Sequence, residues 1–169
     1  AWRVIMVKET EARRQPKPPF TTSTLQQAAS SRFGFAPSRT MGVAQKLYEQ
    51  GLITYMRTDS VTVSTEALPV IFGAIERFFG KELVVPRAYQ TKSRSAQEAH
   101  EAVRPTDAGK RHAGANEEQR RLYSLIWSRT VASQMADARI LRTKIGANVI
   151  GAPEPIPDFT ANGSRVIEP

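Results

Sequence analysis

Strand patterns at both ends of the chain, around a middle with helical periodicity, are the feature that most constrains its fold. Residues 2–10 are rich in apolar and β-branched side chains, and residues 140–150 have the same character. The dipeptide Asn162-Gly163 then predicts a turn before another short strand. The strands at the two ends of the chain can pair with each other if they belong to one sheet. The pattern therefore predicts an α+β fold in which a mainly helical domain is inserted between strands.

Apolar residues recur at helical spacing through the middle of the chain, which predicts helices over residues 24–33, 39–50, 66–79, 96–103 and 116–135. Gly34 and Gly51 each follow a predicted helix and are typical helix stops. Ser38 is a candidate cap for the second helix. The first two helices, followed by a predicted strand over residues 53–58, favour a helix-turn-helix or winged-helix-like unit. An ordinary helical pair fits this pattern equally well.

Composition excludes several classes of protein. The longest apolar runs fall far short of the ~20 residues that span a bilayer, and the absence of cysteine excludes disulfides, thiolate catalysis and the usual zinc sites. The chain has 24 Lys and Arg against 16 Asp and Glu, and its net charge of +8 suits a polyanionic partner, although a solvated basic surface fits equally well. No initiator Met or secretory leader is visible, and both ends lie inside strand patterns, so we expect a piece of a longer protein.

Residues 51–60 place a candidate nucleophile, Tyr55, two positions before a permanent cation, Arg57. In a strand, both side chains would emerge on the same face, roughly 7 Å apart at their Cα atoms. A phenol has a pKa of about 10, so a tyrosine that attacks phosphorus needs a positive neighbour to stabilise its phenolate. Arg57 would serve this purpose. A half-buried tyrosine beside a solvated arginine is the alternative.

Three other tyrosines compete with Tyr55 on chemistry alone. Tyr48 lies on the apolar face of a predicted helix and is expected in the core. Tyr123 falls in the predicted long helix, and Tyr89 in a loop. Among the four, Tyr55 has an arginine two positions after it.

Three motifs carry a more specific signal than this pair. They are Pro-Pro-Phe-Thr-Thr-Ser-Thr-Leu-Gln-Gln-Ala-Ala at 18–29, Gly-Leu-Ile-Thr-Tyr-Met-Arg-Thr-Asp-Ser at 51–60 and Gln-Glu-Ala-His-Glu-Ala-Val-Arg-Pro-Thr-Asp at 97–107. In this order and spacing, they resemble the bacterial type IA DNA topoisomerases. Met56 resembles the topoisomerase I branch, because topoisomerase III relatives usually have proline there. The resemblance is clearest over residues 18–140.

The resemblance implies roles for particular residues. Tyr55 would attack a single-stranded DNA phosphate to form a 5′-phosphotyrosine ester, and Arg57 would contact the scissile phosphate. The family segment that matches residues 97–107 has a histidine, here His100, that contacts nucleotide and takes part in proton relay, and its partner aspartate matches Asp59. In a helix, His100 and Arg104 would share a face. The expected DNA-binding residues are Arg104, Thr58, Gln97, Ser23 and Thr24.

The resemblance also implies a domain organisation. Residues 20–139 would form the helical active-site tyrosine domain, and residues 1–19 and 140–169 parts of a β-rich arch or hinge domain. Residues 17–19 and 138–141 would be paired hinges. The family's Mg²⁺ site belongs to an acidic Asp-x-Asp-containing domain, and no such cluster occurs in this sequence. The expected cofactor is therefore Mg²⁺ bound by a domain absent from this chain, and we expect no metal site here.

The sequence thus predicts a fragment of a DNA topoisomerase I that cleaves and reseals one DNA strand to relax negative supercoils, and that is inactive alone. Its expected partners are single-stranded DNA and the remaining domains of the same polypeptide, with no membrane, in the bacterial cytoplasm at the nucleoid. Two alternatives stay open. One is a non-catalytic winged-helix DNA-binding module with Tyr55 in its wing, and the other is a basic structural domain that contacts proteins.

Overall fold

The chain divides into two compact units in the computed structural model, which describes residues 1–90, 101–151 and 156–168. One unit comprises Ala1–Gln15 with Asp137–Pro169, and the other comprises Pro16–Ala136. Within the described residues, the first unit is a three-stranded sheet and the second contains four α-helices. The predicted α+β class is therefore confirmed.

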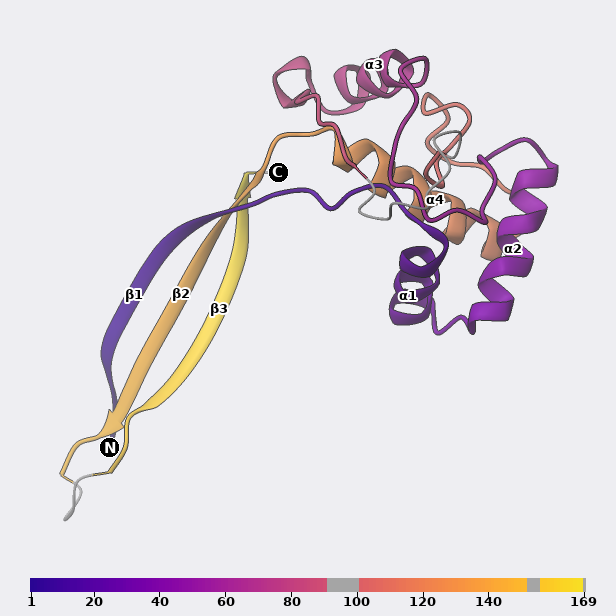
Figure 1. Ribbon diagram of the computed structural model, residues 1–169. Helices are drawn as coiled ribbons and strands as arrows, with labels where there is room; N and C mark the ends of the chain where they lie inside the picture. The colour runs from indigo at the N-terminus through magenta and orange to yellow at the C-terminus, as the bar shows by residue number, and fades with distance from the viewer. Residues whose placement is uncertain (91–100, 152–155, 169) are drawn as a thin grey trace. The chain divides into compact units, whose positions relative to one another are not determined.

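The sheet is built from both ends of the chain. Its strands are β1 (Trp2–Arg14), β2 (Ala138–Val149) and β3 (Phe159–Glu168), antiparallel in the order β1-β2-β3 (Figure 1). Arg14 pairs with Ala138, so the chain leaves and re-enters the sheet at the same end. The terminal segments therefore share one sheet, in agreement with the prediction.

Two predictions about the sheet were wrong. Asn162 and Gly163 form no turn, because they pair with Lys144 and Thr143 in the interior of β3. Residues 138–141 form no hinge, because they are the first residues of β2 and pair with residues 11–14 of β1. In both places, a ladder of backbone hydrogen bonds holds the segment extended.

The second unit has the helices α1 (Thr22–Phe33), α2 (Pro37–Glu49), α3 (Leu68–Phe78) and α4 (Glu117–Ser133), with a short 3-10 turn at Lys81–Leu83. Thr21 and Thr24 form a reciprocal capping box at the start of α1, and Gly34 ends that helix at φ 69°. Asn116 caps α4 by accepting a hydrogen bond from the Gln119 amide. The predicted Ser38 cap was wrong: α2 begins at Pro37, which suits the first turn because its missing N–H needs no partner.

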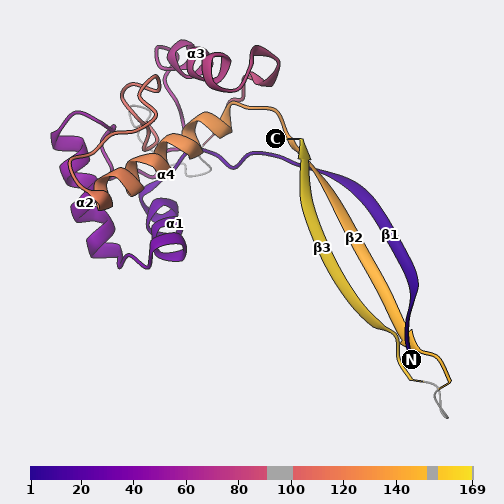
Figure 2. The same cartoon turned by 180° about the vertical axis from the view of Figure 1, so that it is seen from behind.

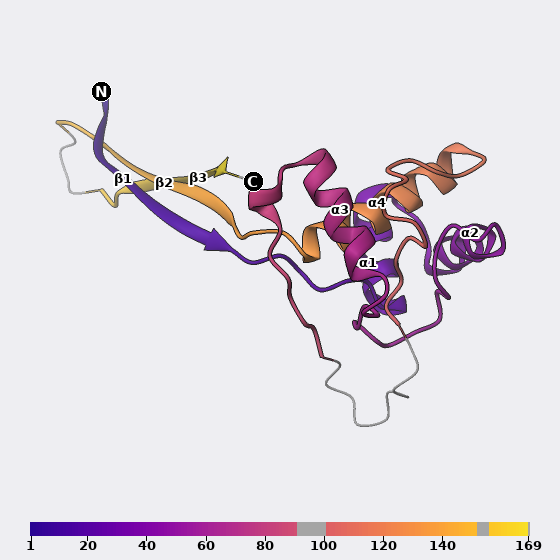
Figure 3. The ribbon, with the colours of Figure 1, turned by 90° about the horizontal axis from the view of Figure 1, so that it is seen from above.

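The hydrophobic core of the second unit centres on α4. This helix packs against α1, α2 and α3, as Figure 2 and the view from above in Figure 3 show. Leu122 and Ile126 of α4 are fully buried, together with Leu25 of α1 and Leu47 of α2. In the described part of the chain, no helix is both long and apolar enough to cross a membrane.

Tertiary pairing overrides two local patterns in this unit. The predicted helix over residues 96–103 was wrong for residues 101–103, which are extended, with Val103 bridging to Phe20; residues 96–100 lie outside the described residues. The predicted strand over residues 53–58 was also wrong, because this segment makes only an isolated bridge between Ile53 and Pro105. The amides of Ala102 and Val103 donate to the carbonyl oxygens of Thr62 and Phe20. The amide of Thr54 donates to the carbonyl oxygen of Arg104.

Candidate functional site

The predicted nucleophile lies in an extended segment whose side chains alternate between burial and exposure. The buried residues are Met56, Thr58 and Ser60, and the exposed residues are Tyr55, Arg57 and Asp59. The ring of Tyr55 is 49% exposed. Tyr55 and Arg57 are therefore both presented to solvent, although their segment forms no strand.

The start of α1 holds one half of this segment. The Thr22 hydroxyl donates to the carbonyl oxygen of Met56 at 2.7 Å and accepts from the Thr58 amide at 2.9 Å. The Thr22 amide in turn donates to the Thr58 carbonyl oxygen at 2.9 Å. One threonine therefore fixes the backbone on both sides of Arg57.

Residues 101–106 hold the other half. The Thr54 hydroxyl donates to the Ala102 carbonyl oxygen at 2.7 Å and accepts from the Arg104 amide at 2.9 Å. The Thr54 amide donates to the Arg104 carbonyl oxygen at 2.9 Å. Tyr55 thus lies between two anchored positions, Thr54 before it and Met56 after it, and its backbone has little freedom to move.

A second tyrosine packs against Tyr55. The rings of Tyr48 and Tyr55 meet edge to face, with centroids 5.2 Å apart, a geometry that aromatic pairs prefer. The prediction that Tyr48 lies in the core was wrong, because its side chain is 41% exposed. The buried face of α2 uses Val43, Ala44 and Leu47 instead.

The structure makes Tyr123 a poor nucleophile. Its ring is buried, and its hydroxyl donates to the carbonyl oxygen of Lys110 at 2.6 Å. Burial, together with the charge of Asp107, raises the pKa of Tyr123 to about 12. The Tyr89 hydroxyl donates to the Ser133 carbonyl oxygen at 3.0 Å, in a partly buried position.

Next to Arg57 lies an open surface hollow of about 590 Å³. It is lined by Thr21, Thr22, Ser23, Gln26, Arg57, Thr58 and Asp59. The first turn of α1 forms one wall, and the segment after Tyr55 forms the other. Exposed donors from Ser23 and Arg57 at one hollow suit an anionic group, and Asp59 is a carboxylate beside them.

Arg104, one of the residues predicted to bind DNA, lies mostly inside the protein. Its side chain is 13% exposed, its Nε donates to Glu101 and its Nη1 donates to the Pro105 carbonyl oxygen. Burial raises the pKa of Glu101, but the hydrogen bonds from Arg104 and Ser64 and the charge of Arg104 outweigh this effect, so the pKa of Glu101 is lowered from its usual value. The predicted helical face shared by His100 and Arg104 was wrong at its Arg104 end, since residues 101–104 are not helical.

The remaining predicted residues differ in what the structure says of them. Ser23 lines the hollow, and Thr24 is exposed in the capping box of α1. Thr58 is buried, and its hydroxyl accepts from the Ser60 amide at 3.0 Å. Gln97 and His100 lie outside the described residues. Their roles therefore stay predictions.

Comparison with known proteins decides the family. A family model described as DNA topoisomerase matches residues 1–169. The chain belongs to the DNA topoisomerase family. This match, together with relatives named DNA topoisomerase 1, confirms the resemblance to the bacterial topoisomerase I group that was inferred from three motifs.

Individual topoisomerases agree with this assignment over most of the chain. DNA topoisomerase 1 of Synechocystis sp. is 46% identical over 170 residues, which cover 98% of this chain and 18% of that protein. DNA topoisomerase 1 of Zymomonas mobilis is 52% identical over 134 residues, covering 78% of this chain and 11% of that protein. The structure of full-length topoisomerase I from Thermotoga maritima matches with a TM-score of 0.74 and 35% identity, over 99% of this chain and 28% of that one.

Sequence reasoning missed the residues that position Tyr55. Thr22 and Thr54 were not singled out, although both belong to the recognised motifs at 18–29 and 51–60. Threonine is common at helix starts and in extended segments, so its residue type does not distinguish an anchoring role. The contact between Tyr48 and Tyr55 had no local signal, since it depends on how α2 packs.

Replacement of Thr22 by valine should loosen the segment that carries Tyr55. Thr22→Val keeps the shape but removes the acceptor of the buried Thr58 amide, and we expect a loss of about 1–3 kcal/mol in unfolding free energy. Hydrogen exchange at the Thr58 amide should accelerate as well. Ser30→Ala, at an exposed position of the same helix, is the matched control and should change stability by less than about 0.5 kcal/mol. Unchanged exchange at Thr58 in Thr22→Val would contradict the anchoring role.

Proposed function

We propose that this chain carries the nucleophilic tyrosine of a bacterial DNA topoisomerase I. The complete polypeptide would cleave and reseal one DNA strand to relax negative supercoils, at the nucleoid. The observation that carries the proposal is the exposed Tyr55 phenol, held near Arg57 in a segment anchored by Thr22 and Thr54. Family membership supplies the substrate class, since the relatives are named DNA topoisomerase 1.

Each step of the proposed reaction forms one bond between phosphorus and oxygen and breaks another. The Tyr55 hydroxyl oxygen attacks phosphorus and loses its proton, while the bond from phosphorus to the 3′ oxygen breaks and that oxygen gains a proton. The products are a 5′-phosphotyrosine ester and a free 3′-hydroxyl. Resealing is the reverse attack by that hydroxyl, so no ATP is needed. Attachment to the 5′ phosphate follows the family resemblance.

Arg57 would stabilise the charge that develops on the phosphate. Its planar guanidinium can donate two parallel hydrogen bonds to phosphate oxygens, a geometry that lysine cannot reproduce. Asp59, exposed two positions further on, and His100 are the proposed proton-relay residues. Ser23 and Thr24, exposed in the first turn of α1, would donate to a neighbouring phosphate of single-stranded DNA. Gln97, Arg104 and Thr58 stay proposed DNA contacts by resemblance.

We also propose that the helical unit is a winged-helix-like domain inserted into a β-rich arch. The pair α1 and α2 supports the helical part of that likeness, while the expected wing strand at residues 53–58 does not form. The register between Arg14 and Ala138 supports the insertion, because both connections leave the sheet at one end.

The described residues do not fit a Mg²⁺ site. Across residues 1–90, 101–151 and 156–168, no group of three or more His, Asp or Glu side chains could hold a metal ion. We therefore propose that Mg²⁺ is bound elsewhere in the polypeptide. The chain described here would then lack part of the catalytic machinery.

Loss of the Tyr55 hydroxyl should abolish covalent trapping of DNA. Tyr55→Phe in the complete polypeptide removes one oxygen and little volume, so we expect no detergent-resistant DNA adduct and nearly unchanged DNA binding. Tyr48→Phe is the matched control, because it removes the hydroxyl of the neighbouring ring and should leave trapping intact. An adduct in Tyr55→Phe would refute the nucleophile assignment. Failure of the wild-type polypeptide to form any adduct would favour the non-catalytic winged-helix module.

Substitution of Arg57 should slow cleavage without removing charge. Arg57→Lys keeps the cation but loses the planar fork, and we expect the single-turnover cleavage rate to fall roughly tenfold to a thousandfold, the scale of one transition-state donor. Arg39→Lys makes the same change at an exposed arginine that pairs with Glu118, and should leave the rate unaltered. A wild-type rate for Arg57→Lys would mean that Arg57 does not act on the phosphate.

The 169-residue chain alone should not relax supercoiled DNA. It contains Tyr55, but we propose that the Mg²⁺ site and the parts that manage the second strand belong to the rest of the polypeptide. Incubation of the purified chain with negatively supercoiled plasmid and Mg²⁺ should leave the topoisomer distribution unchanged. Relaxation that disappears in a Tyr55→Phe preparation would show instead that the chain is self-sufficient.

A further inference from the structure

We propose that one face of the three-stranded sheet is a second nucleic-acid contact, which binds backbone phosphates without reading sequence. The inference rests on the proposed function, because it takes DNA as the substrate class. It concerns Ala1–Gln15 with Asp137–Pro169, whereas Tyr55 and Arg57 belong to the other unit. The face is defined by two adjacent rows of side chains, here named the phosphate face.

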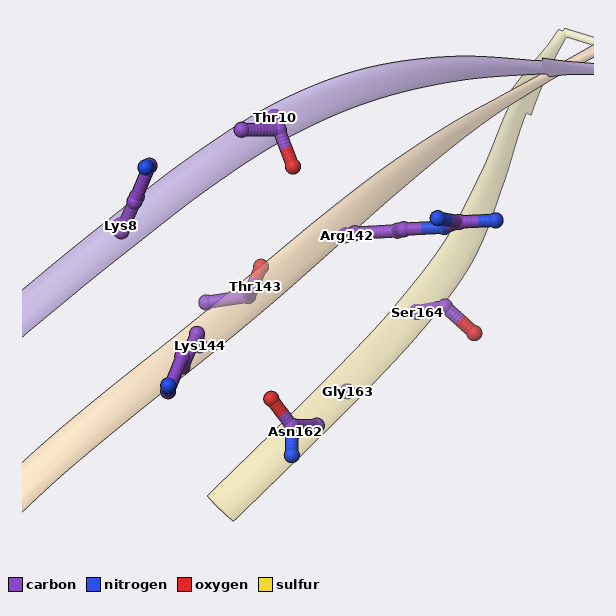
Figure 4. A pocket seen from close by; sticks show the side chains of 8 residues that line it. All are labelled: Lys8, Thr10, Arg142, Thr143, Lys144, Asn162, Gly163 and Ser164. Atoms are coloured by element: carbon purple, nitrogen blue, oxygen red, sulfur yellow. The ribbon is translucent and has the colours of Figure 1, made fainter. Parts of the chain in front are cut away.

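The strand register places these side chains together. The two rows are Lys8, Lys144 and Asn162, and Thr10, Arg142 and Ser164. Members of one row are about 5 Å apart across the strands, and the rows are about 7 Å apart because alternate residues share a face. Figure 4 shows the six side chains on the three strands, with that of Arg142 extending from β2 toward β3.

An open hollow of about 540 Å³ lies on this face. Its lining consists of the six row residues together with Thr143 and Gly163, which lie between the rows on β2 and β3. All six row residues are exposed. The phosphate face is therefore a shallow, accessible surface.

The acidic side chains of β1 stand on the face opposite the phosphate face. Lys8, Arg142 and Lys144 stand on the phosphate face, whose two rows contain no carboxylate. The acidic side chains Glu9 and Glu11 stand on the opposite face by alternation along β1. There, Glu9 accepts from the Thr143 hydroxyl at 3.3 Å, and Glu11 pairs with Arg139 at 2.7 Å. The two rows of the phosphate face therefore hold three cations and no carboxylate.

The side chains of the phosphate face suit contact with the backbone of a polyanion. Arg, Lys, Ser, Thr and Asn are the side chains that donate to phosphate oxygens in protein–nucleic acid contacts. The face is open and extends over two rows and three strands, which fits an extended chain of phosphates better than one enclosed phosphate. Neither row contains an aromatic side chain for base stacking, so binding should be independent of sequence.

The salt dependence of DNA binding tests the proposal. Binding of a labelled single-stranded oligonucleotide to the 169-residue chain would be followed by fluorescence anisotropy at several salt concentrations. The double variant Arg142→Gln/Lys144→Gln should bind more weakly. Its slope of log affinity against log salt should be shallower by about 1.4, since each lost phosphate contact on a single strand contributes about 0.7.

A control with the same loss of charge separates the phosphate face from net charge. Arg13→Gln/Arg165→Gln removes two exposed cations from the opposite face of the sheet, and its slope should change by less than about 0.7. Equal slopes for the two double variants would overturn the proposal. Weakened binding to anionic lipid vesicles with unchanged DNA binding would overturn it too, in favour of a membrane surface.

A measurement on the unmodified chain tests the proposal without depending on whether the variants fold. Bound DNA should slow acetylation of Lys8 and Lys144, read by mass spectrometry, and unchanged reactivity at both would overturn the proposal. The wild-type chain and the Arg142→Gln/Lys144→Gln variant could show the same slope of log affinity against log salt. That result would reject the phosphate face as a DNA contact and leave the proposed function untouched. If the complete polypeptide forms no covalent adduct with DNA, the proposed function itself fails, whatever the slopes are.

Discussion

The site depends above all on how the backbone of residues 54–58 satisfies its hydrogen bonds outside any regular sheet. An extended segment without strand partners must find other acceptors and donors, or it carries a cost of about 1–3 kcal/mol for each buried group left unpaired. Thr22 and Thr54 meet this need with their hydroxyls as well as their amides. This arrangement holds Met56 and Thr58 inward, and it thereby presents Tyr55 and its neighbour to solvent on a fixed backbone.

The tertiary structure also determines which cations pair with carboxylates inside the protein and which are exposed. Arg104 is nearly buried beside Glu101, and Arg39 pairs with Glu118, so the charges of these arginines are partly balanced within the protein. Arg57 stands in the open hollow at α1, and the cations of the phosphate face stand apart from the carboxylates of the sheet. A net charge of +8 thus says that a polyanion is favoured, but not which arginines and lysines are placed to meet it.

Two of the errors in the sequence predictions share one cause. Residues 101–103 have a helical pattern, yet they are extended because Val103 pairs with Phe20 and the amide of Ala102 donates to Thr62. Asn162-Gly163 is a strong turn signal, yet it lies inside β3 because β2 offers a full ladder of partners. In each place, pairing with a segment distant in the sequence outweighed a local preference worth only a fraction of a kcal/mol to about 1 kcal/mol per residue.

The sequence alone determined the strongly periodic elements and the family. The apolar spacing of α4, the glycine stop of α1 and the β-branched ends are local properties, and a motif such as that around Tyr55 is recognised without coordinates. Only the tertiary structure decided that Tyr48 lies against Tyr55, that Thr22 anchors its segment, and that the two rows of the phosphate face contain no carboxylate. These properties depend on contacts between residues far apart in the chain. Their energies come from packing and hydrogen bonds that no local window of sequence contains.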